Sequence, residues 1–326
     1  MTKRQNHKTI SNPMDALNNL GASLGVTSAE LIFGLLGCLL AIYLGVHLAK
    51  TQARAFKGAA PGTTDAASVT QGHLPPVTFA DYGDMRFLHL GTPWVQGSMK
   101  ISHPYEIHLE YVQRMMGWML FTDLDRISHL RAMQLGLGAA ALTKFCHHHL
   151  DMHTTAVELN PQVVTACRKW FHLPADNEKL QVLIADAAEL TQNEAWFGTM
   201  DVLQVDLYDQ NAAMPALDSE AFYQGCRQLL TPTGCMTVNL YGRESNLEQS
   251  IQAITRVFGP DTVWAFKPTS SGNSVVLAFR EPPKIDKATL KSRSKAIESR
   301  WPLPATKWLK TLAPTHSLPQ KLSVLR

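Results

Sequence analysis

Apolar runs typical of strands alternate with amphipathic runs typical of helices through residues 127–283. The expected strands cover residues 131–138, 154–159, 180–186, 200–207 and 234–242. The expected helices cover residues 140–150, 161–171, 219–230 and 247–259. Two further apolar runs, at 262–268 and 274–280, predict a hairpin at the sheet edge. This alternation predicts an α/β fold with a mostly parallel sheet covered on both faces, whose ligands bind beyond the carboxyl ends of the strands.

A shorter β region precedes this part of the chain, at residues 76–126. Residues 85–90 alternate apolar and polar side chains, a Gly-Thr-Pro run breaks the pattern, and residues 94–101 are again strand-like. This arrangement predicts a β-hairpin. Apolar side chains then recur at three- and four-residue spacings, which predicts an amphipathic helix over residues 106–121.

A charge-free apolar run of 19 residues, Leu31–Ala49, follows the N-terminal segment 1–30. Its length is about that of a helix that crosses the hydrocarbon core of a membrane. A cleaved signal peptide fits poorly because thirty residues precede the run. The run is therefore expected to be an inner-membrane anchor or a buried helix, and the balanced basic residues on its two sides give no orientation. Residues 50–75 lack apolar periodicity and are expected to form a linker.

Charge is distributed unevenly along the chain. Residues 1–57 carry six basic and two acidic side chains, and residues 284–326 carry ten and two, which leaves 14 basic and 23 acidic side chains in residues 58–283. An acidic body argues against nucleic acid as its ligand and favours a cationic one. The basic C-terminal region 284–326 is expected to form a helix over 286–299 and then an arm. That arm either packs on the body through its tryptophans or binds a partner or membrane surface.

The cysteines point to a reducing compartment. Five cysteines form no C-x-x-C pair and no spacing of a zinc site, so free thiols and a cytoplasmic catalytic domain are expected. Neighbouring side chains on a helix point about 100° apart. The run Cys146–His149 is therefore expected to be a solvated helix end, and no metal is predicted.

The candidate site lies at the ends of four successive strands. The first strand runs into the turn Leu135–Ala140, where Gly136 and Gly138 permit a close approach of the backbone to a ligand. Glu158 ends the second strand, at the distance along the chain where a carboxylate can accept both hydrogens of a ribose diol. Asp186 ends the third and Asp206 the fourth. Together these positions predict a nucleoside site, whereas the missing G-x-G-x-x-G and P-loop motifs argue against a dinucleotide or a nucleoside triphosphate.

The loop after the fourth strand predicts the second substrate. Asp206 and Asp209 stand three residues apart in a loop at the sheet edge. Two carboxylates in such a place suit a cationic amine better than a neutral or anionic nucleophile. An alkylamine, with a pKa of about 10.4, arrives protonated, so a carboxylate must both bind it and accept its proton.

Residues 76–280 contain a set of motifs: Leu88-x-Leu90, Gln96, Leu135-Gly-Leu-Gly138, Val157-Glu158, Asp186-Ala187, Asp206-x-x-Asp209, Phe222-Tyr223 and Thr237-Val-Asn239-Leu. With these motifs the chain resembles the spermidine synthase (polyamine aminopropyltransferase) family. It implies a class I methyltransferase-like, Rossmann-like domain at 127–283 behind a small β region. It also implies aminopropyl transfer from decarboxylated S-adenosylmethionine to a polyamine such as putrescine, without a metal. A homodimer is left open.

The resemblance also implies a role for each matching position. Asp206 would be the catalytic base, and the substrate-binding residues would be Asp209, Gln96 and Tyr111. The donor would be bound by Gly136, Gly138, Glu158, Asp186 and Ala187, with Glu158 on the ribose and Asp186 on the adenine.

Two places depart from the family pattern. Ala139 and Ala140 stand where the glycine turn usually continues with Asp-Gly, whose acid lies near the amino end of the donor. Tyr111-Val112-Gln113 stands in place of Tyr-His-Glu. Both changes remove carboxylates that recognise ammonium groups. Two other functions therefore stay open, namely methyl transfer from intact S-adenosylmethionine and nucleoside binding without turnover by a membrane-tethered homologue.

Overall fold

The computed structural model of this protein describes residues 74–208, 219–241 and 244–317. The expected anchor Leu31–Ala49, the segment 1–30, nearly all of the linker and the candidate residue Asp209 lie outside these ranges. Within the ranges, no helix has the length and apolar character needed to cross a membrane.

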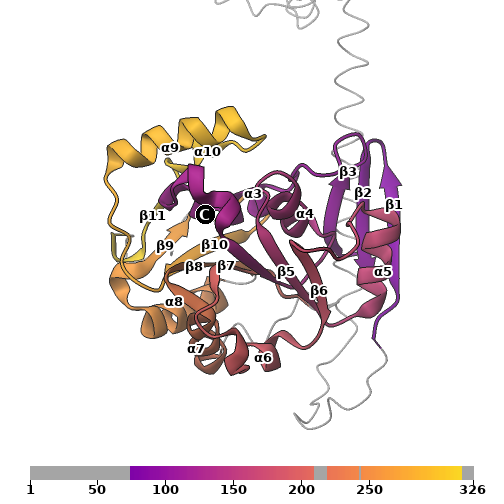
Figure 1. The fold of residues 1–326 in the computed structure, drawn as a ribbon, viewed down its shortest axis with the longest axis horizontal. Coiled ribbons are helices and arrows are strands. Elements are labelled where there is room, and N and C mark those ends of the chain that lie inside the picture. The colour runs from indigo at the N-terminus through magenta and orange to yellow at the C-terminus, as the bar shows by residue number, and fades with distance from the viewer. Residues whose placement is uncertain (1–73, 209–218, 242–243, 318–326) are drawn as a thin grey trace, which may run out of the picture. The chain divides into compact units, whose positions relative to one another are not determined.

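The main sheet has eight strands in the order β11-β9-β10-β8-β7-β4-β5-β6 (Figure 1). Five parallel strands form one part of it: β4 (Arg131–Leu135), β5 (His153–Glu158), β6 (Leu180–Ile184), β7 (Met200–Val205) and β8 (Leu230–Tyr241). The remaining part is antiparallel: β9 (Val263–Phe266), β10 (Asn273–Phe279) and β11 (Leu312–Pro314). The predicted α/β, Rossmann-like class is confirmed.

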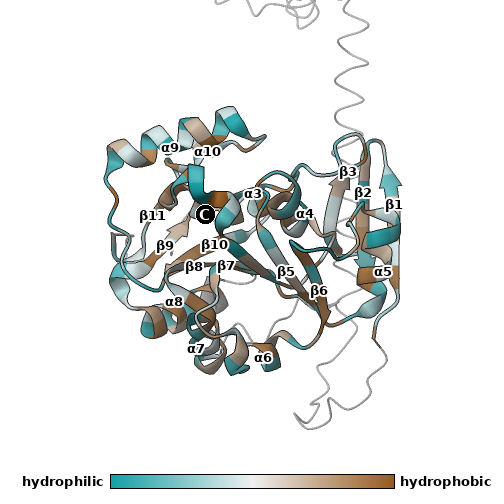
Figure 2. Ribbon diagram, in the orientation of Figure 1, coloured by the Kyte–Doolittle hydropathy of each residue, from teal (hydrophilic) through white to brown (hydrophobic). Residues whose placement is uncertain are grey.

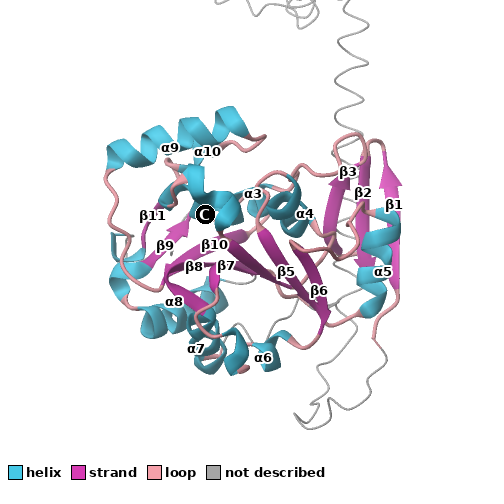
Figure 3. Ribbon diagram, viewed as in Figure 1, coloured by secondary structure: helices cyan, strands magenta, loops and turns pink. Residues whose placement is uncertain are grey.

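Both faces of this sheet are covered by helices (Figure 3). One face packs on α6 (Ala187–Leu190), α7 (Glu220–Leu229) and α8 (Glu244–Phe258). The other packs on α3 (Glu110–Met115), α4 (Ala141–His148), α9 (Lys287–Arg300) and α10 (Ala305–Trp308). Strand β10 shows why, since Val275 and Leu277 enter one cluster while Val276 and Ala278 enter the other. Successive strand side chains point to opposite faces, so an unbroken apolar strand needs cover on both; Figure 2 shows the hydrophobic residues along the central strands.

A separate antiparallel sheet contains β1 (Val77–Tyr82), β2 (Met85–Leu90) and β3 (Val95–Lys100) in that order. The predicted hairpin is its β2–β3 pair. Strand β1 was missed by the sequence reading because five of its six residues are exposed, which leaves no alternation of apolar and polar positions to detect. Helix α5 (Pro161–Trp170) packs near this sheet.

Two sequence predictions are wrong in detail. The helix expected over 106–121 begins at Glu110 and changes at Met116 into a 3₁₀-helical stretch that ends at Phe121. Apolar spacings of three and four fit both helix types, so the pattern could not separate them. The β9–β10 hairpin is not the sheet edge, because β11 from the C-terminal arm pairs with β9.

The C-terminal arm packs on the body, which confirms one of the two expectations for it. Trp308 is 2% exposed within the main core cluster. The indole of Trp301 donates a hydrogen bond of 3.1 Å to the carbonyl oxygen of His149, beside the end of α4. At that helix end His148 is exposed and stacks on Tyr105, with 3.9 Å between the ring centroids. The backbone at the end of α4 therefore helps to hold the arm, through the bond from Trp301.

Candidate active site

The glycine turn after β4 brings two other segments against the strand end. Gly136 has φ +84°, and a Cβ there would overlap the backbone oxygen of Asp206. Gly138 has φ +50°, and a Cβ there would lie 2.8 Å from the backbone oxygen of Gln96. Both positions require glycine, because the left-handed backbone and the short contacts exclude a side chain. The turn therefore fixes Asp206 and Gln96 on its two sides.

Glu158 ties the end of β5 to the same turn. Its Oε2 accepts a hydrogen bond from the backbone nitrogen of Leu137, and its Oε1 accepts one from that of Asn160, both at 2.9 Å. Burial raises the pKa of Glu158, while these backbone donors oppose the rise. A carboxylate oxygen can accept more than one hydrogen bond, so Glu158 keeps acceptor capacity for a diol.

Asp186 and Ala187 follow β6, the outermost strand of the parallel part. The Oδ1 of Asp186 accepts a hydrogen bond of 2.7 Å from the backbone nitrogen of Ala188, which caps α6. Ala187 is the buried first residue of that helix. The cap orients the half-buried carboxylate of Asp186 at the carboxyl end of the sheet.

Asp206 stands directly after β7 and is held from three sides. Its backbone nitrogen donates to the carbonyl oxygen of Leu135 at 3.0 Å. Asn239 donates from Nδ2 to Oδ1 at 2.9 Å, and the Tyr111 hydroxyl donates to Oδ2 at 3.3 Å. Burial raises the pKa of Asp206, and these two side-chain donors lower it. The carboxylate is thus a buried, oriented acceptor whose acidity its neighbours set.

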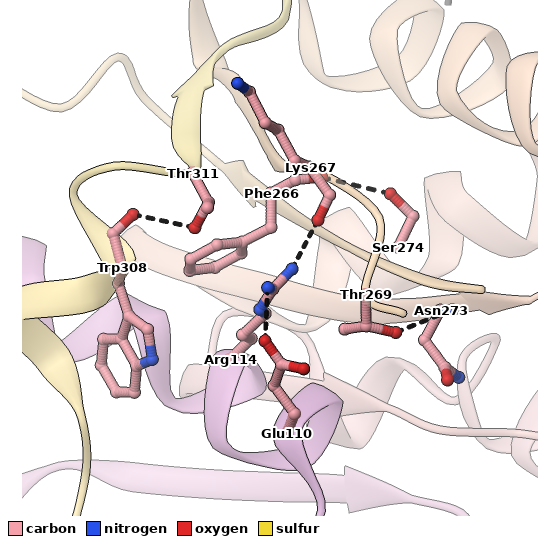
Figure 4. Close-up of polar contacts among 9 residues, drawn as sticks. All are labelled: Glu110, Arg114, Phe266, Lys267, Thr269, Asn273, Ser274, Trp308 and Thr311. Atoms are coloured by element: carbon pink, nitrogen blue, oxygen red, sulfur yellow. Dashed lines mark hydrogen bonds and ion pairs between the residues drawn. The ribbon is translucent and has the colours of Figure 1, made fainter. Parts of the chain in front are cut away.

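A buried arginine, Arg114, lies three residues after Tyr111 on α3 and anchors this helix (Figure 4). Arg114, 7% exposed, pairs with Glu110 at 2.6 Å and donates to the carbonyl oxygen of Lys267 at 2.5 Å. Its guanidinium lies 5.6 Å from the centroid of the Phe266 ring. A planar guanidinium can make such contacts at once, so Arg114 connects the helix of Tyr111 to the end of β9.

Asn239 is held in turn by a second amide. Asn273 donates from Nδ2 to Oδ1 of Asn239 at 3.1 Å, and the backbone nitrogen of Asn273 donates to the Thr269 hydroxyl at 3.1 Å. Both asparagines are buried. Because Oδ1 of Asn239 accepts this bond, its Nδ2 faces Asp206. The sequence analysis placed Asn239 in a matching strand without a role and missed Asn273. The available signals were a polar side chain inside the run 234–242 and another directly before the run 274–280.

Side chains from both sheets enclose a narrow cavity of about 20 Å³ beside Asp206. Its polar lining side chains come from Gln96, Ser98, His108, Tyr111, Gln134 and Asp206. Three of them, Ser98, His108 and Gln134, were not predicted. The structure therefore brings Gln96, Tyr111, Gly138 and Asp206 to one cavity, with Glu158 behind the turn at Leu137. Asp186 and Ala187 lie along the same sheet edge but do not line it.

The family's usual acid is absent at the turn, and the packing leaves little room for it. Ala139 is 3% exposed and lies in a cluster with Leu88 and Met99. Gly97 of β3 faces it so closely that a Cβ on Gly97 would lie 2.5 Å from the backbone nitrogen of Ala139. Strand β3 thus rests directly on the turn.

Comparisons with known proteins agree with this geometry. A family model described as the spermine/spermidine synthase domain matches residues 136–278. The chain is 35% identical over 234 residues to a polyamine aminopropyltransferase of Neisseria meningitidis, which covers 71% of this chain and 86% of that protein.

Solved structures share the fold. A probable spermidine synthase from Corynebacterium glutamicum has a TM-score of 0.56 at 17% identity, over 73% of this chain and 87% of that chain. Human methyltransferase-like protein 13 in complex with SAH has a TM-score of 0.54 at 22% identity, over 59% and 92%. At these identities the likeness concerns architecture. The sequence relationship goes further: this chain belongs to the spermine/spermidine synthase family and is a polyamine aminopropyltransferase-like transferase.

Proposed function

We propose that this protein transfers an aminopropyl group from decarboxylated S-adenosylmethionine to a diamine such as putrescine, and that the products are spermidine and methylthioadenosine. The observation that carries the proposal is the placement of Asp206. Its carboxylate is buried beside the glycine turn and held by Asn239 and Tyr111. The side-chain hydrogen bonds leave lone pairs on both oxygens for an ammonium group.

In this reaction Asp206 accepts a proton from the attacking ammonium group. The freed nitrogen lone pair forms a bond to the propyl carbon next to sulfur, the carbon–sulfur bond breaks, and its electron pair neutralises the sulfonium. The sulfonium is already a good leaving group, so alignment of nitrogen, carbon and sulfur supplies much of the rate. A pKa raised by burial suits Asp206 to this exchange, because a base works best when its pKa is near the working pH.

Tyr111 supports the base as a hydrogen-bond donor. Burial and the neighbouring Asp206 raise the pKa of Tyr111 well above its ordinary value. The phenol therefore keeps its proton at neutral pH and goes on donating to Asp206. Gln96 reaches the cavity from the other sheet, and Asp209 would hold the second ammonium group of the diamine.

The donor's nucleoside would lie along the strand ends. Glu158 would accept from the ribose hydroxyls and Asp186 from the adenine amino group, while Gly136, Gly138 and Ala187 would offer backbone to it. Glu158 supports this placement because two backbone donors already orient its carboxylate at the end of β5.

Methyl transfer from intact S-adenosylmethionine is a second candidate, and Ala139 favours it. At this position the turn lacks the acid that would bind the ammonium group of a decarboxylated donor. Strand β3 packs directly against Ala139. A donor that keeps its carboxylate would then meet no negative charge at residue 139.

The test incubates the purified full chain with each donor and putrescine, and follows methylthioadenosine, spermidine and S-adenosylhomocysteine by mass spectrometry. Aminopropyl transfer yields the first two products from the decarboxylated donor. The variant Asp206→Asn should lose this activity, while Asp261→Asn, an exposed acid in the turn before β9, serves as its matched control. Release of S-adenosylhomocysteine alone would establish the methyltransferase instead.

A further inference from the structure

A second, larger cavity lies outside the candidate active site, between α9, β9 and β11. Its volume is about 610 Å³, within the range of roughly 300–1,000 Å³ that is usual for small-molecule sites. The cavity is lined by α9 and the C-terminal arm that follows it, together with Trp264 of β9. Figure 1 shows α9 beside α10 and above β11.

The floor of this cavity is apolar. Trp264, Leu290, Leu309 and Leu312 line it, and Ala313 and Pro314 of β11 complete the apolar side. Leu309, Leu312 and Trp264 are only half-buried although they pack against the main core cluster. When an apolar ligand covers half-buried apolar side chains in a concave site, their surface is removed from water and the free energy of the system falls.

The rim is positively charged. Lys287, Lys291 and Lys295 follow one another at four-residue intervals on α9, which places them on one face of the helix. Lys310, between α10 and β11, also lines the cavity. All four are exposed. The ion pairs found among the described residues involve other side chains, such as Arg300 with Asp125.

This lysine row costs stability in the free protein. Like charges four residues apart repel on a helix, and Lys287 stands at the N-terminal end, where the helix dipole disfavours a cation. An anion between the lysines would remove both penalties. Residues 318–326, which follow β11, carry Lys321 and Arg326 and no acidic side chain.

We propose that this cavity binds an anionic amphiphile, a ligand with an apolar chain and a phosphate or carboxylate head. The chain lies on the floor formed by Trp264, Leu290 and Leu312, and the head lies among Lys287, Lys291 and Lys295. A concave site of this volume holds one such molecule, whereas a folded protein partner needs about 800 Å² of surface on each side. The ligand comes either from a lipid bilayer or from a soluble acyl compound, and both present the same chemistry.

The test measures binding to the full-length protein by titration calorimetry. The probes are dodecyl phosphate below its micelle concentration, dodecyl maltoside as its neutral counterpart, and inorganic phosphate as the head alone. Dodecyl phosphate should bind at least about tenfold more tightly than either of the others, since each lacks one half of the recognition.

Variants locate the site. The pair Lys291→Gln and Lys295→Gln should weaken dodecyl phosphate binding about tenfold, since two exposed charge pairs of ordinary strength multiply to that factor. The matched control changes Lys284 and Lys307 to glutamine, because both are exposed and neither lines the cavity. Its affinity should stay within about twofold of the unmodified chain. Unchanged melting temperatures confirm that both variants fold.

A bilayer arm identifies the source of the ligand. If the Lys291 and Lys295 variant loses binding to phosphatidylglycerol vesicles relative to phosphatidylcholine vesicles, the ligand is a membrane lipid; if only dodecyl phosphate binding falls, the ligand is soluble. The proposal is overturned by equal binding of dodecyl maltoside, by equally tight binding of inorganic phosphate, or by no effect of the lysine variant. Tighter binding of a glutamate decapeptide would also overturn it and assign the cavity to an acidic protein segment.

Discussion

Replacing Asn239 by leucine removes the amide that donates to the candidate base and keeps a side chain of similar size. The Nδ2 of Asn239 lies 2.9 Å from Oδ1 of Asp206, and Asn239 is 2% exposed. A buried hydrogen bond to a charged group contributes about 1.5–3 kcal/mol. One pKa unit corresponds to about 1.4 kcal/mol, so losing the bond should raise the pKa of Asp206 by about one to two units. The sign follows because the amide stabilises the ionised carboxylate.

The assay is the pH dependence of the turnover of putrescine with the decarboxylated donor. In Asn239→Leu the acidic limb of the profile should move to higher pH by about one to two units. Asn273→Leu is the control, because it removes the bond that orients Asn239 and leaves the donor to Asp206 in place. Its limb should move by less than half as much. An unmoved limb in Asn239→Leu, or equal shifts in both variants, would refute this account of the base.

Three further outcomes are expected. Gly136→Ala should lower the free energy of unfolding, measured by urea titration, by about 3 kcal/mol or more. Gly83→Ala is the control, because Gly83 also has a positive φ but open space around its Cβ, and it should lower the free energy of unfolding by about 1 kcal/mol. Equal losses in the two variants would contradict a clash between residue 136 and Asp206. Because burial raises the pKa of Asp206 in the folded state, its ionisation destabilises the fold above the unfolded pKa. Asp206→Asn should therefore raise the melting temperature at pH 7, with a smaller difference near pH 3, and a lower melting temperature at pH 7 would count against this. Lys144 is 1% exposed, and burial lowers its pKa from 10.5 to about 8. The unfolded chain then binds more protons between those values, so the free energy of unfolding should rise by up to about 3 kcal/mol from pH 8 to pH 10.5, and Lys144→Met should flatten the rise. A slope unchanged in Lys144→Met would assign the effect to other groups.

Periodicity in the sequence was sufficient to predict strands β4 to β10 and helices α4, α5, α7 and α8 of the α/β domain, but not the short helix α6. A buried strand and an amphipathic helix each have their own spacing of apolar residues along the chain. The order of elements can therefore be predicted without knowing their contacts. The acids Glu158, Asp186 and Asp206 were found for the same reason, because each directly follows an apolar run. Parallel strands then bring their carboxyl ends to one sheet edge.

Contacts between distant segments were not predictable in this way. Strand β11 pairs with β9 across about fifty residues of chain, and nothing in its three residues marks it as a strand. The apolar spacing of the helix gives Arg114 no role, yet Arg114 is buried against Lys267 and Phe266. The large cavity likewise requires α9 and β9 to be placed together before it exists.

The sequence by itself determined the alternation of strands and helices, the glycine turn and the acids at the strand ends, because these depend on neighbours along the chain. Only the tertiary structure decided that Tyr111 and Asn239 donate hydrogen bonds to Asp206, and that Asn273 orients Asn239. Those hydrogen bonds join residues tens of positions apart. Their geometry is set by the packing of whole elements, and it is this packing that adjusts the acidity of the candidate base.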